Sequence, residues 1–290
     1  MQFNSVLTDI SRGTWAISFE GLQSYAPIVS KLLAGETVDF GAAKVPNAFV
    51  FFYDSSGKSV LAKNTDLPEG SIAVVEMNGP IVKRGDMCTY GADEIVAALQ
   101  MAESNPNIIG TILKIDGPGG SVSAIPPFIE FGKNKTKPVI GLYDMCCSAH
   151  LYAMLSCCDY IMAENNLSAT IGSIGVMLSL KDNREELKLK GIVIHEIYPK
   201  ESASKNEAWR LALEGKYELI KEEMLSPMAV QFQNAVKNAR PNLKIDEPGV
   251  LTGKTFTADK AKEIGLIDSI GSQTAAMQMV QMMSEMNRYN

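Results

Sequence analysis

Apolar and polar positions follow two alternating rhythms along the chain from about residue 71 onward. Short, nearly continuous apolar runs rich in β-branched residues predict buried strands. Segments with apolar residues every three or four positions predict helices that pack against a core. The predicted strands are 72–77, 108–115, 139–142, 159–163 and 192–197, with a loop entering a strand at 171–180. The predicted helices are 92–102, 122–133, a helix opening at Ser148, 184–190, 211–239, 257–264 and 274–286. This alternation predicts parallel strands joined by crossover helices, an α/β fold.

The first 65 residues follow a different pattern. An amphipathic segment covers 22–33 and a short strand-like run covers 48–53. The polar stretch 54–70 contains Gly and Pro and is typical of a long loop. We therefore expect a small N-terminal extension over residues 1–65 and one α/β domain over residues 66–290.

Composition excludes several functional classes. Hydrophobic residues make up 46% of the 290 residues and charged ones 21%, which is typical of a folded globular chain. The net charge of −6 and the lack of Lys/Arg clusters argue against a general nucleic-acid binder. The N-terminus carries charge early and has no apolar core segment, so we expect neither a signal peptide nor a membrane anchor, but a soluble, cytoplasmic protein.

The cysteines do not suggest a metal site or a disulfide framework. There are five of them, an odd number, and four stand as adjacent pairs without C-x-x-C spacing. We predict that they are reduced, buried and structural. The five are Cys88, Cys146, Cys147, Cys157 and Cys158.

The stretch 143–154 contains the strongest candidate for a catalytic group, Ser148. An apolar run ends there in a patch of small residues, and a helix-like pattern begins at once. A serine at this position would lie at a helix N-terminus, where backbone N–H groups and the helix dipole favour a developing negative charge.

A second candidate element is the Gly-rich stretch 114–122. A strand that ends in Gly-Pro-Gly-Gly exposes backbone N–H groups with no side chain in the way, which suits an oxyanion hole. A plain turn or a phosphate-binding loop remains an alternative, although the spacings of the common nucleotide-binding motifs are absent.

A hydrolytic serine needs a base, and the candidates are few. His150 is too close to Ser148 along a helix, and His195 lies within an apolar run, which indicates a structural role. A Ser-His-Asp triad is therefore hard to build. The polar loop 198–207 offers Lys200 and Lys205, and a lysine whose charged form is disfavoured by burial can accept a proton.

Five ordered motifs together resemble the signal peptide peptidase A family of serine peptidases, and in particular its phage head-maturation members. The motifs are 74–82, 115–122, 147–153, 170–176 and 251–268. The sequence Arg-Gly-Thr-Trp-Ala-Ile at 12–17 is similar to the leader region of those phage proteases. The resemblance implies a Clp/crotonase-like fold with a parallel sheet and flanking helices.

The resemblance also implies roles for individual residues. The nucleophile falls on Ser148, and the oxyanion donors fall on the N–H of Ala149 and of Gly119 or Gly120. The base falls in the loop after residue 197. Lys205, which matches the spacing to the next helix, is the first choice, and Lys200, which matches the spacing from the serine, is the alternative. Ser173 matches the serine that hydrogen-bonds the lysine. Neither a metal nor another cofactor is implied.

This chain departs from the family pattern at two places. Ser-Ala-His at Ser148 replaces the usual Ser-Gly-Gly, and Asp-Gly-Pro at Asp116 replaces the usual Asp-Ser-Pro. Ala149 still supplies an N–H, but His150 is expected to narrow the site.

The sequence thus predicts a serine endopeptidase with a Ser-Lys dyad that processes capsid or scaffold proteins during phage head assembly. Its partners would be protein or peptide substrates and further copies of itself, with sites shared between subunits. The alternatives are a soluble cellular peptidase of the same family, a catalytically silent assembly protein and a crotonase-like acyl-CoA enzyme.

Overall fold

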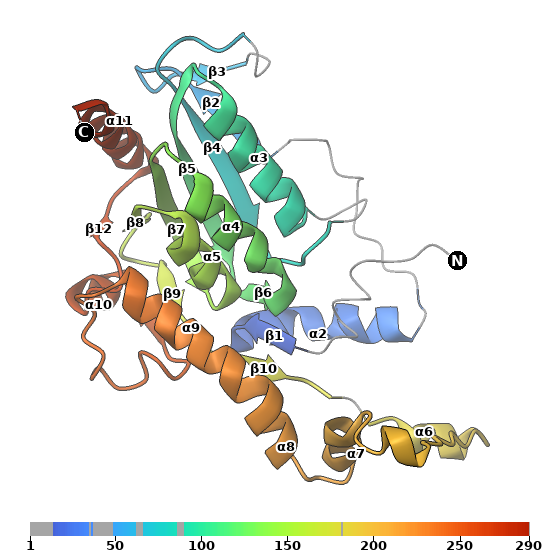
Figure 1. Cartoon of the computed structure of the whole chain (residues 1–290). Helices are drawn as coiled ribbons and strands as arrows, with labels where there is room; N and C mark the ends of the chain where they lie inside the picture. Colours follow the sequence, from blue (N-terminus) through green and yellow to red (C-terminus); the bar gives the residue numbers. More distant parts are fainter. Residues whose placement is uncertain are drawn as a thin grey trace.

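The structure is a computed structural model that describes residues 14–34, 36, 49–61, 66–85, 90–180 and 182–289. Cys88 and residues 12–13 of the leader-like motif lie outside the described residues. Within the described part, the chain forms a nine-stranded sheet and a three-stranded sheet, with helices on both faces of the larger one (Figure 1). The predicted α/β class is confirmed.

The centre of the large sheet is parallel, as the apolar runs predicted. Its core strands are β4 (Ser71–Asn78), β5 (Ile108–Gly117), β7 (Val139–Cys147), β8 (Tyr160–Ala163) and β9 (Thr170–Gly172). All neighbouring pairs among them are parallel. Antiparallel strands flank this centre, and β12 pairs in parallel with β8. The flanking strands are β2 (Val50–Tyr53), β3 (Ser59–Val60), β11 (Thr255–Thr257) and β12 (Ser269–Ile270).

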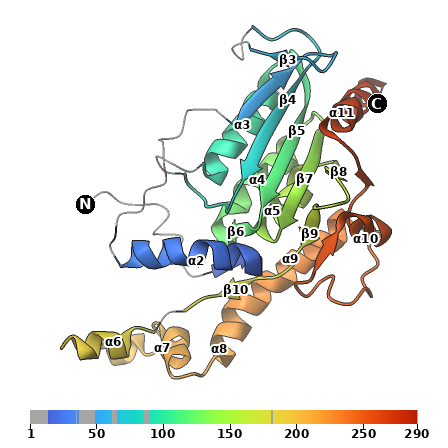
Figure 2. The same ribbon diagram turned by 180° about the vertical axis from the view of Figure 1, so that it is seen from behind.

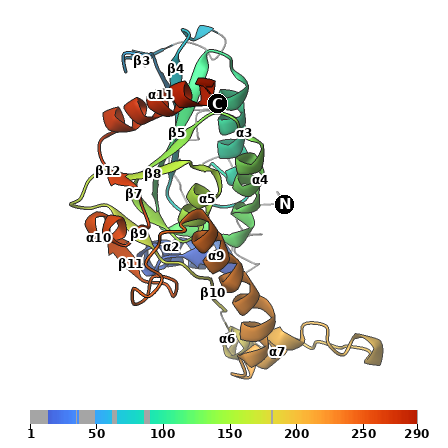
Figure 3. The ribbon, with the colours of Figure 1, turned by 60° about the vertical axis from the view of Figure 1, so that its left-hand side comes forward.

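Helices cover both faces of the large sheet (Figure 3). One face packs against α3 (Ala92–Ser104), α4 (Pro126–Asn134), α5 (Ala149–Cys157) and α9 (Ser226–Ala239). The other face packs against α11 (Gln273–Tyr289), which contacts β5 and β7 and whose buried Ala276, Met277 and Val280 belong to one core cluster with Ile112 and Ile140. The Met-rich C-terminal helix therefore packs on the body of the chain, while Met282 and Met286 stay exposed.

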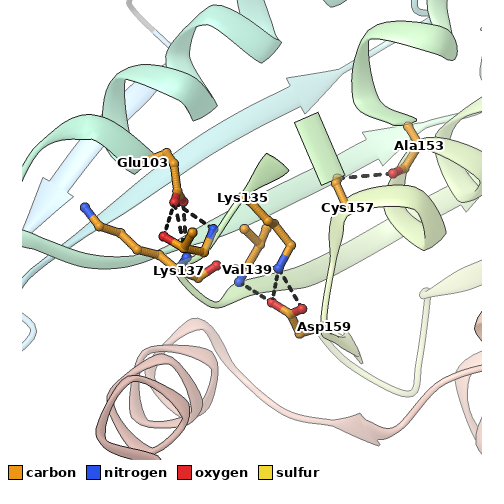
Figure 4. A network of polar contacts seen from close by, with 8 residues as sticks. Glu103, Lys135, Lys137, Val139, Ala153, Cys157 and Asp159 are labelled. Carbon is orange, nitrogen blue, oxygen red and sulfur yellow. Dashed lines mark hydrogen bonds and ion pairs between the residues drawn. The ribbon is translucent and has the colours of Figure 1, made fainter. Parts of the chain in front are cut away.

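A polar network fixes the start of β7, the strand that leads to Ser148 (Figure 4). Asp159 accepts hydrogen bonds from the Val139 N–H at 2.8 Å and from the Lys135 ammonium at 2.5 and 2.6 Å. Glu103 accepts hydrogen bonds from the backbone N–H groups of Thr136 and Lys137. Since these charge-assisted bonds hold the first residue of β7, they also help to set where the strand ends.

The predicted N-terminal extension contributes to both sheets. The segment β1 (Thr14–Ile17) lies between β6 (Gly119–Ser121) and β10 (Met177–Leu178) in the small sheet, and α2 (Phe19–Leu33) follows it. Strands β2 and β3 extend the large sheet beyond β4. The division at residue 65 stays a prediction.

Two predicted elements differ from the structure. The run 192–197, predicted as a buried strand, has no regular secondary structure, and Ile194 and Ile197 are 67% and 91% exposed. His195 is exposed rather than structural. A continuous apolar run has the same sequence pattern whether it is buried in the core of its own chain or against another surface. Among the described residues, no strand pairs with this run.

The helix predicted over 211–239 is broken. It consists of α7 (Glu207–Leu213), α8 (Glu218–Ile220), a π-helical turn (Lys221–Leu225) and α9. Gly215 adopts a φ of +78° between α7 and α8, which ends the first helix. We call residues 182–217 the arm; it carries α6 (Arg184–Leu189) and α7 and projects from the body in every view (Figures 1, 2 and 3).

Candidate active site

Ser148 forms a one-residue junction between a buried strand and a helix. Strand β7 ends at Cys147 and α5 begins at Ala149. Ser148 has a φ of +56° and a ψ of −113°, a conformation that non-glycine residues rarely adopt. Such strain persists only where the surrounding structure imposes it, and it is typical of functional positions. The side chain is almost fully buried.

The last residue of β9 and the segment that follows it bind the serine from one side. The Ser148 N–H donates to the Gly172 carbonyl at 2.9 Å, and its hydroxyl donates to the Gly175 carbonyl at 3.3 Å. Ser173 also has a positive φ, of +55°, and its N–H donates to the Lys254 carbonyl at 3.0 Å. The structure thus brings Ser148 and the motif 170–176 together.

His150, near the start of α5, contacts the turn at Gly119 and Gly120, which we call the Gly-rich turn. The Gly119 N–H donates a 2.9 Å hydrogen bond to Nδ1 of His150, whose side chain is fully buried. The bond requires a ring without a proton on Nδ1, so the neutral tautomer carries its proton on Nε2. Among the described residues, Nε2 has no hydrogen-bond partner. The imidazole therefore holds the Gly-rich turn and does not act as the base for Ser148.

The two departures from the family pattern occupy the same space. A Cβ added at Gly117 would lie 2.5 Å from both Cε1 and Nε2 of His150, and 2.6 Å from the Gly79 carbonyl oxygen. A serine at position 117 and a histidine at position 150 therefore exclude each other. The sequence showed both departures but not their contact; their occurrence together was the signal that could have revealed it.

The hydrogen bond to His150 narrows the choice of oxyanion donors. Because the Gly119 N–H already has an acceptor, it is not free to bind a substrate oxygen. The N–H of Ala149 lies in the first turn of α5, where backbone donors lack partners within the helix. Ala149 and Gly120 remain the candidate donors.

Neither candidate lysine lies at the serine. Lys200 begins a 3-10 turn (Lys200–Ser202) on the arm, and Lys205 lies between that turn and α7; both are exposed. The arm is separated from α5 in all three views (Figures 1, 2 and 3) and from β6 in Figures 1 and 2. Within this chain, the structure therefore does not bring a lysine of the arm to Ser148.

No group of three or more potential metal-ligating side chains occurs among the residues that the structure describes. Of the cysteines described, Cys146, Cys147 and Cys157 are buried and Cys158 is partly buried, all without a disulfide. No helix in the described ranges is long and apolar enough to cross a lipid bilayer.

The buried histidine predicts a pH dependence of stability. Burial lowers the pKa of His150 to about 3. In the unfolded chain the pKa returns to about 6.5, so below that pH the unfolded state binds a proton that the folded state does not. The free energy of unfolding therefore falls as the pH drops from 6.5 towards 3, by up to about 1.4 kcal/mol per pH unit.

His150→Asn keeps an acceptor near the position of Nδ1 but cannot titrate. Between pH 7 and 5, we expect the wild type to lose about 2 kcal/mol more unfolding free energy than this variant. Urea unfolding of both proteins at the two pH values measures the difference. Equal losses would show that His150 is protonated in the folded chain.

Comparisons with known proteins agree with the motifs around Ser148. Residues 132–287 match Peptidase family S49. The chain is 25% identical to Protease 4 of Salmonella typhi over 242 residues, which cover 81% of this chain and 38% of that protein. It is 31% identical to capsid assembly protease C of Escherichia phage lambda over 135 residues, 44% of this chain and 30% of that protein. The chain thus spans well under two thirds of these relatives.

Among solved structures, a mutant of the 1510-N membrane-bound stomatin-specific protease covers 71% of this chain and 82% of its own, with 16% identity and a TM-score of 0.46. The family match extends over more than half of the 290 residues and agrees with the serine-peptidase class that the motifs predicted. This chain is therefore a member of peptidase family S49.

Proposed function

We propose that the chain is a serine endopeptidase whose nucleophile is Ser148 and whose base is a lysine. The observation that carries this proposal is the strained junction at Ser148, which holds a hydroxyl beside the first N–H of α5 in a chain of a peptidase family. The serine oxygen would attack a peptide carbonyl while the neutral lysine takes its proton. The tetrahedral intermediate would then collapse with cleavage of the C–N bond, and the lysine ammonium would give its proton to the leaving amine. Water, deprotonated by the neutral lysine, would hydrolyse the acyl-enzyme ester and release the acyl group as a carboxylic acid, with the proton returned to the serine oxygen.

The N–H groups of Ala149 and Gly120 would bind the tetrahedral oxyanion. Removal of one such donor typically costs about 2.7–4 kcal/mol of transition-state stabilisation. Gly119 would act indirectly, since its bond to His150 holds the turn that presents Gly120. The Ser148 hydroxyl now faces the Gly175 carbonyl, so it must rotate before it meets a base.

We further propose that the base comes from a neighbouring copy of the chain. Lys205 is our choice and Lys200 the alternative, with Ser173 as the hydroxyl that would position the ammonium. The arm supports this proposal, because it projects from the body and exposes a contiguous apolar run that includes Ile192, Val193 and Ile194. Large exposed apolar patches mark protein contacts more often than free surface.

The role we propose is the processing of capsid or scaffold proteins, in the host cytoplasm or an assembling phage head. The support is the similarity to the lambda capsid assembly protease. The similarity to Protease 4 over 81% of the chain favours a cellular peptidase as the second candidate. Co-expression with candidate capsid proteins, followed by mass spectrometry of new termini, distinguishes the two roles.

A fluorophosphonate probe tests the nucleophile. We expect it to label the assembled wild-type protein and to leave Ser148→Ala unlabelled, because only an activated serine attacks the probe. Ser156→Ala is the matched control, since Ser156 lies in the same helix with its hydroxyl bound to the Tyr152 carbonyl, and it should label like the wild type. No labelling of pure, assembled wild type would contradict the serine-peptidase proposal and favour a silent assembly protein.

A further inference from the structure

The segment β1 lies between the two segments that bear on Ser148. On one side it pairs antiparallel with the Gly-rich β6, with Ala16 opposite Gly120 and Ile17 opposite Gly119. On the other side it pairs antiparallel with β10, with Trp15 opposite Met177. Helix α5, which begins just after the serine, contacts β1 as well, and Figure 1 shows β1 beside β6 and β10.

The register of the β1–β6 pair places the backbone of Ala16 opposite Gly120, a proposed oxyanion donor. The Ser18 N–H donates to the Pro118 carbonyl at 2.7 Å, so Ser18 and Pro118 form a hydrogen-bonded pair. Hydrogen-bonded and non-hydrogen-bonded pairs alternate along an antiparallel ladder. Two residues further, Ala16 and Gly120 therefore exchange hydrogen bonds, and the Gly120 N–H donates to the Ala16 carbonyl. The Ala16 carbonyl thus accepts the hydrogen bond from the Gly120 N–H that the attacked carbonyl of a substrate would need.

The side chain of Ala16 is fully enclosed, with no exposed surface. A larger side chain at this position would have to displace the residues packed around it. The strand is also short and ends at once in α2, whose first turn packs on the Gly-rich turn: a Cβ at Gly21 would lie 2.3 Å from Cβ of Pro118. Four paired residues offer only a few hydrogen bonds, each of modest net free energy, so such a strand can exchange with a competitor.

We propose that β1 fills the peptide groove of Ser148 in place of a substrate strand, with Ala16 at the position of the residue whose carbonyl is attacked. A substrate then binds only when β1 leaves, and the groove selects a small residue at that position. This inference rests on the proposed function, since it takes Ser148 as the nucleophile. The segment 14–17 is thus a built-in competitor that the chain carries at its own N-terminal side.

The test uses the full chain in a Ser148→Ala background, so that binding is read without cleavage. The probe is a fluorescent peptide with the sequence of residues 12–19, and its binding is followed by anisotropy. Ala16→Pro removes the N–H that pairs with Gly120, and proline does not fit a central strand, so β1 should be released. We expect this variant to bind the peptide about tenfold more tightly than the chain with Ala16, the factor equivalent to about 1.4 kcal/mol.

Ser59→Pro places the same change in the edge strand β3, away from the groove, and should bind the peptide like the chain with Ser59. A probe peptide in which phenylalanine replaces the alanine should bind at least about tenfold more weakly, because the position is enclosed. Equal affinity of all variants, or equal affinity for both peptides, would overturn the proposal.

A second measurement does not depend on the folding of Ala16→Pro. In the Ser148→Ala chain, a saturating peptide should displace β1 and speed hydrogen exchange at the amide of Ala16. Unchanged protection with bound peptide would show that β1 is a fixed part of the fold. Failure of the fluorophosphonate reaction would reject Ser148 as nucleophile but leave this exchange intact, so the two failures are distinguishable.

Discussion

Lys205→Ala is expected to lower peptide cleavage about 10²–10⁴-fold, the range typical for loss of a general base. Lys200→Ala should merely weaken it. Both lysines are exposed on the same arm, so the two variants are matched in burial and charge. Cleavage of a peptide substrate by each variant, with folding checked by circular dichroism, measures the difference. The reverse order of effects would assign the base to Lys200.

Mixing inactive variants tests whether the lysine comes from a neighbour. If Ser148→Ala and Lys205→Ala chains assemble together at random, about a quarter of the sites join an intact serine to an intact lysine from the next copy. The mixture should then recover about a quarter of the wild-type rate, although each component alone is inactive. No recovery in a mixed assembly would mean that each chain supplies both groups itself, after a movement of its own arm.

Gly117→Ser is expected to destabilise the chain by about 3 kcal/mol, the upper part of the range for overpacking a buried site. The new Cβ would lie 2.5 Å from the His150 ring, and the backbone oxygen of Gly79 blocks the other side. Urea unfolding measures the loss. Gly175→Ser is the matched control, since a Cβ at Gly175 meets nothing within 4 Å, and its unfolding free energy should change by less than about 0.5 kcal/mol.

The double variant Gly117→Ser/His150→Gly restores the family's residues at both positions. In the double variant the serine would fill the space that the imidazole leaves. The loss of unfolding free energy in the double variant should therefore be smaller, by at least about 1 kcal/mol, than the sum of the losses in the two single variants. Additive effects would show that the ring and residue 117 do not share this space. The same double variant would free the Gly119 N–H from its bond to Nδ1.

The local part of the site could be predicted from the sequence. A strand that ends in small residues and continues as a helix indicated where Ser148 lies, and the run of glycines indicated the turn at Gly119 and Gly120. These features depend on short-range preferences of the backbone, which a sequence displays directly. The break at Gly215 also had a local signal, a glycine inside the predicted helix, but helical periodicity on both sides outweighed it.

The remaining features depend on contacts between distant parts of the chain. Strand β1 has four residues and pairs with segments more than a hundred residues away, so no local pattern specifies its partners. The contact between His150 and Gly119 likewise needs the crossover geometry of β5 and β7. The apolar run 192–197 misled because hydrophobicity indicates that a segment will be covered, but not which surface covers it.

At Ser148, the residue that best suits the backbone conformation differs from the residue that catalysis would need. With a φ of +56° and a ψ of −113°, the residue is one that folding alone would make a glycine, which has no Cβ to strain. The attack on a peptide carbonyl that we propose for Ser148 requires a hydroxyl at that point. Selection for thermal stability without selection for cleavage would therefore drift towards glycine at Ser148. A glycine at this position would raise the stability of the fold and remove the proposed peptidase activity, so stability and activity are directly opposed here.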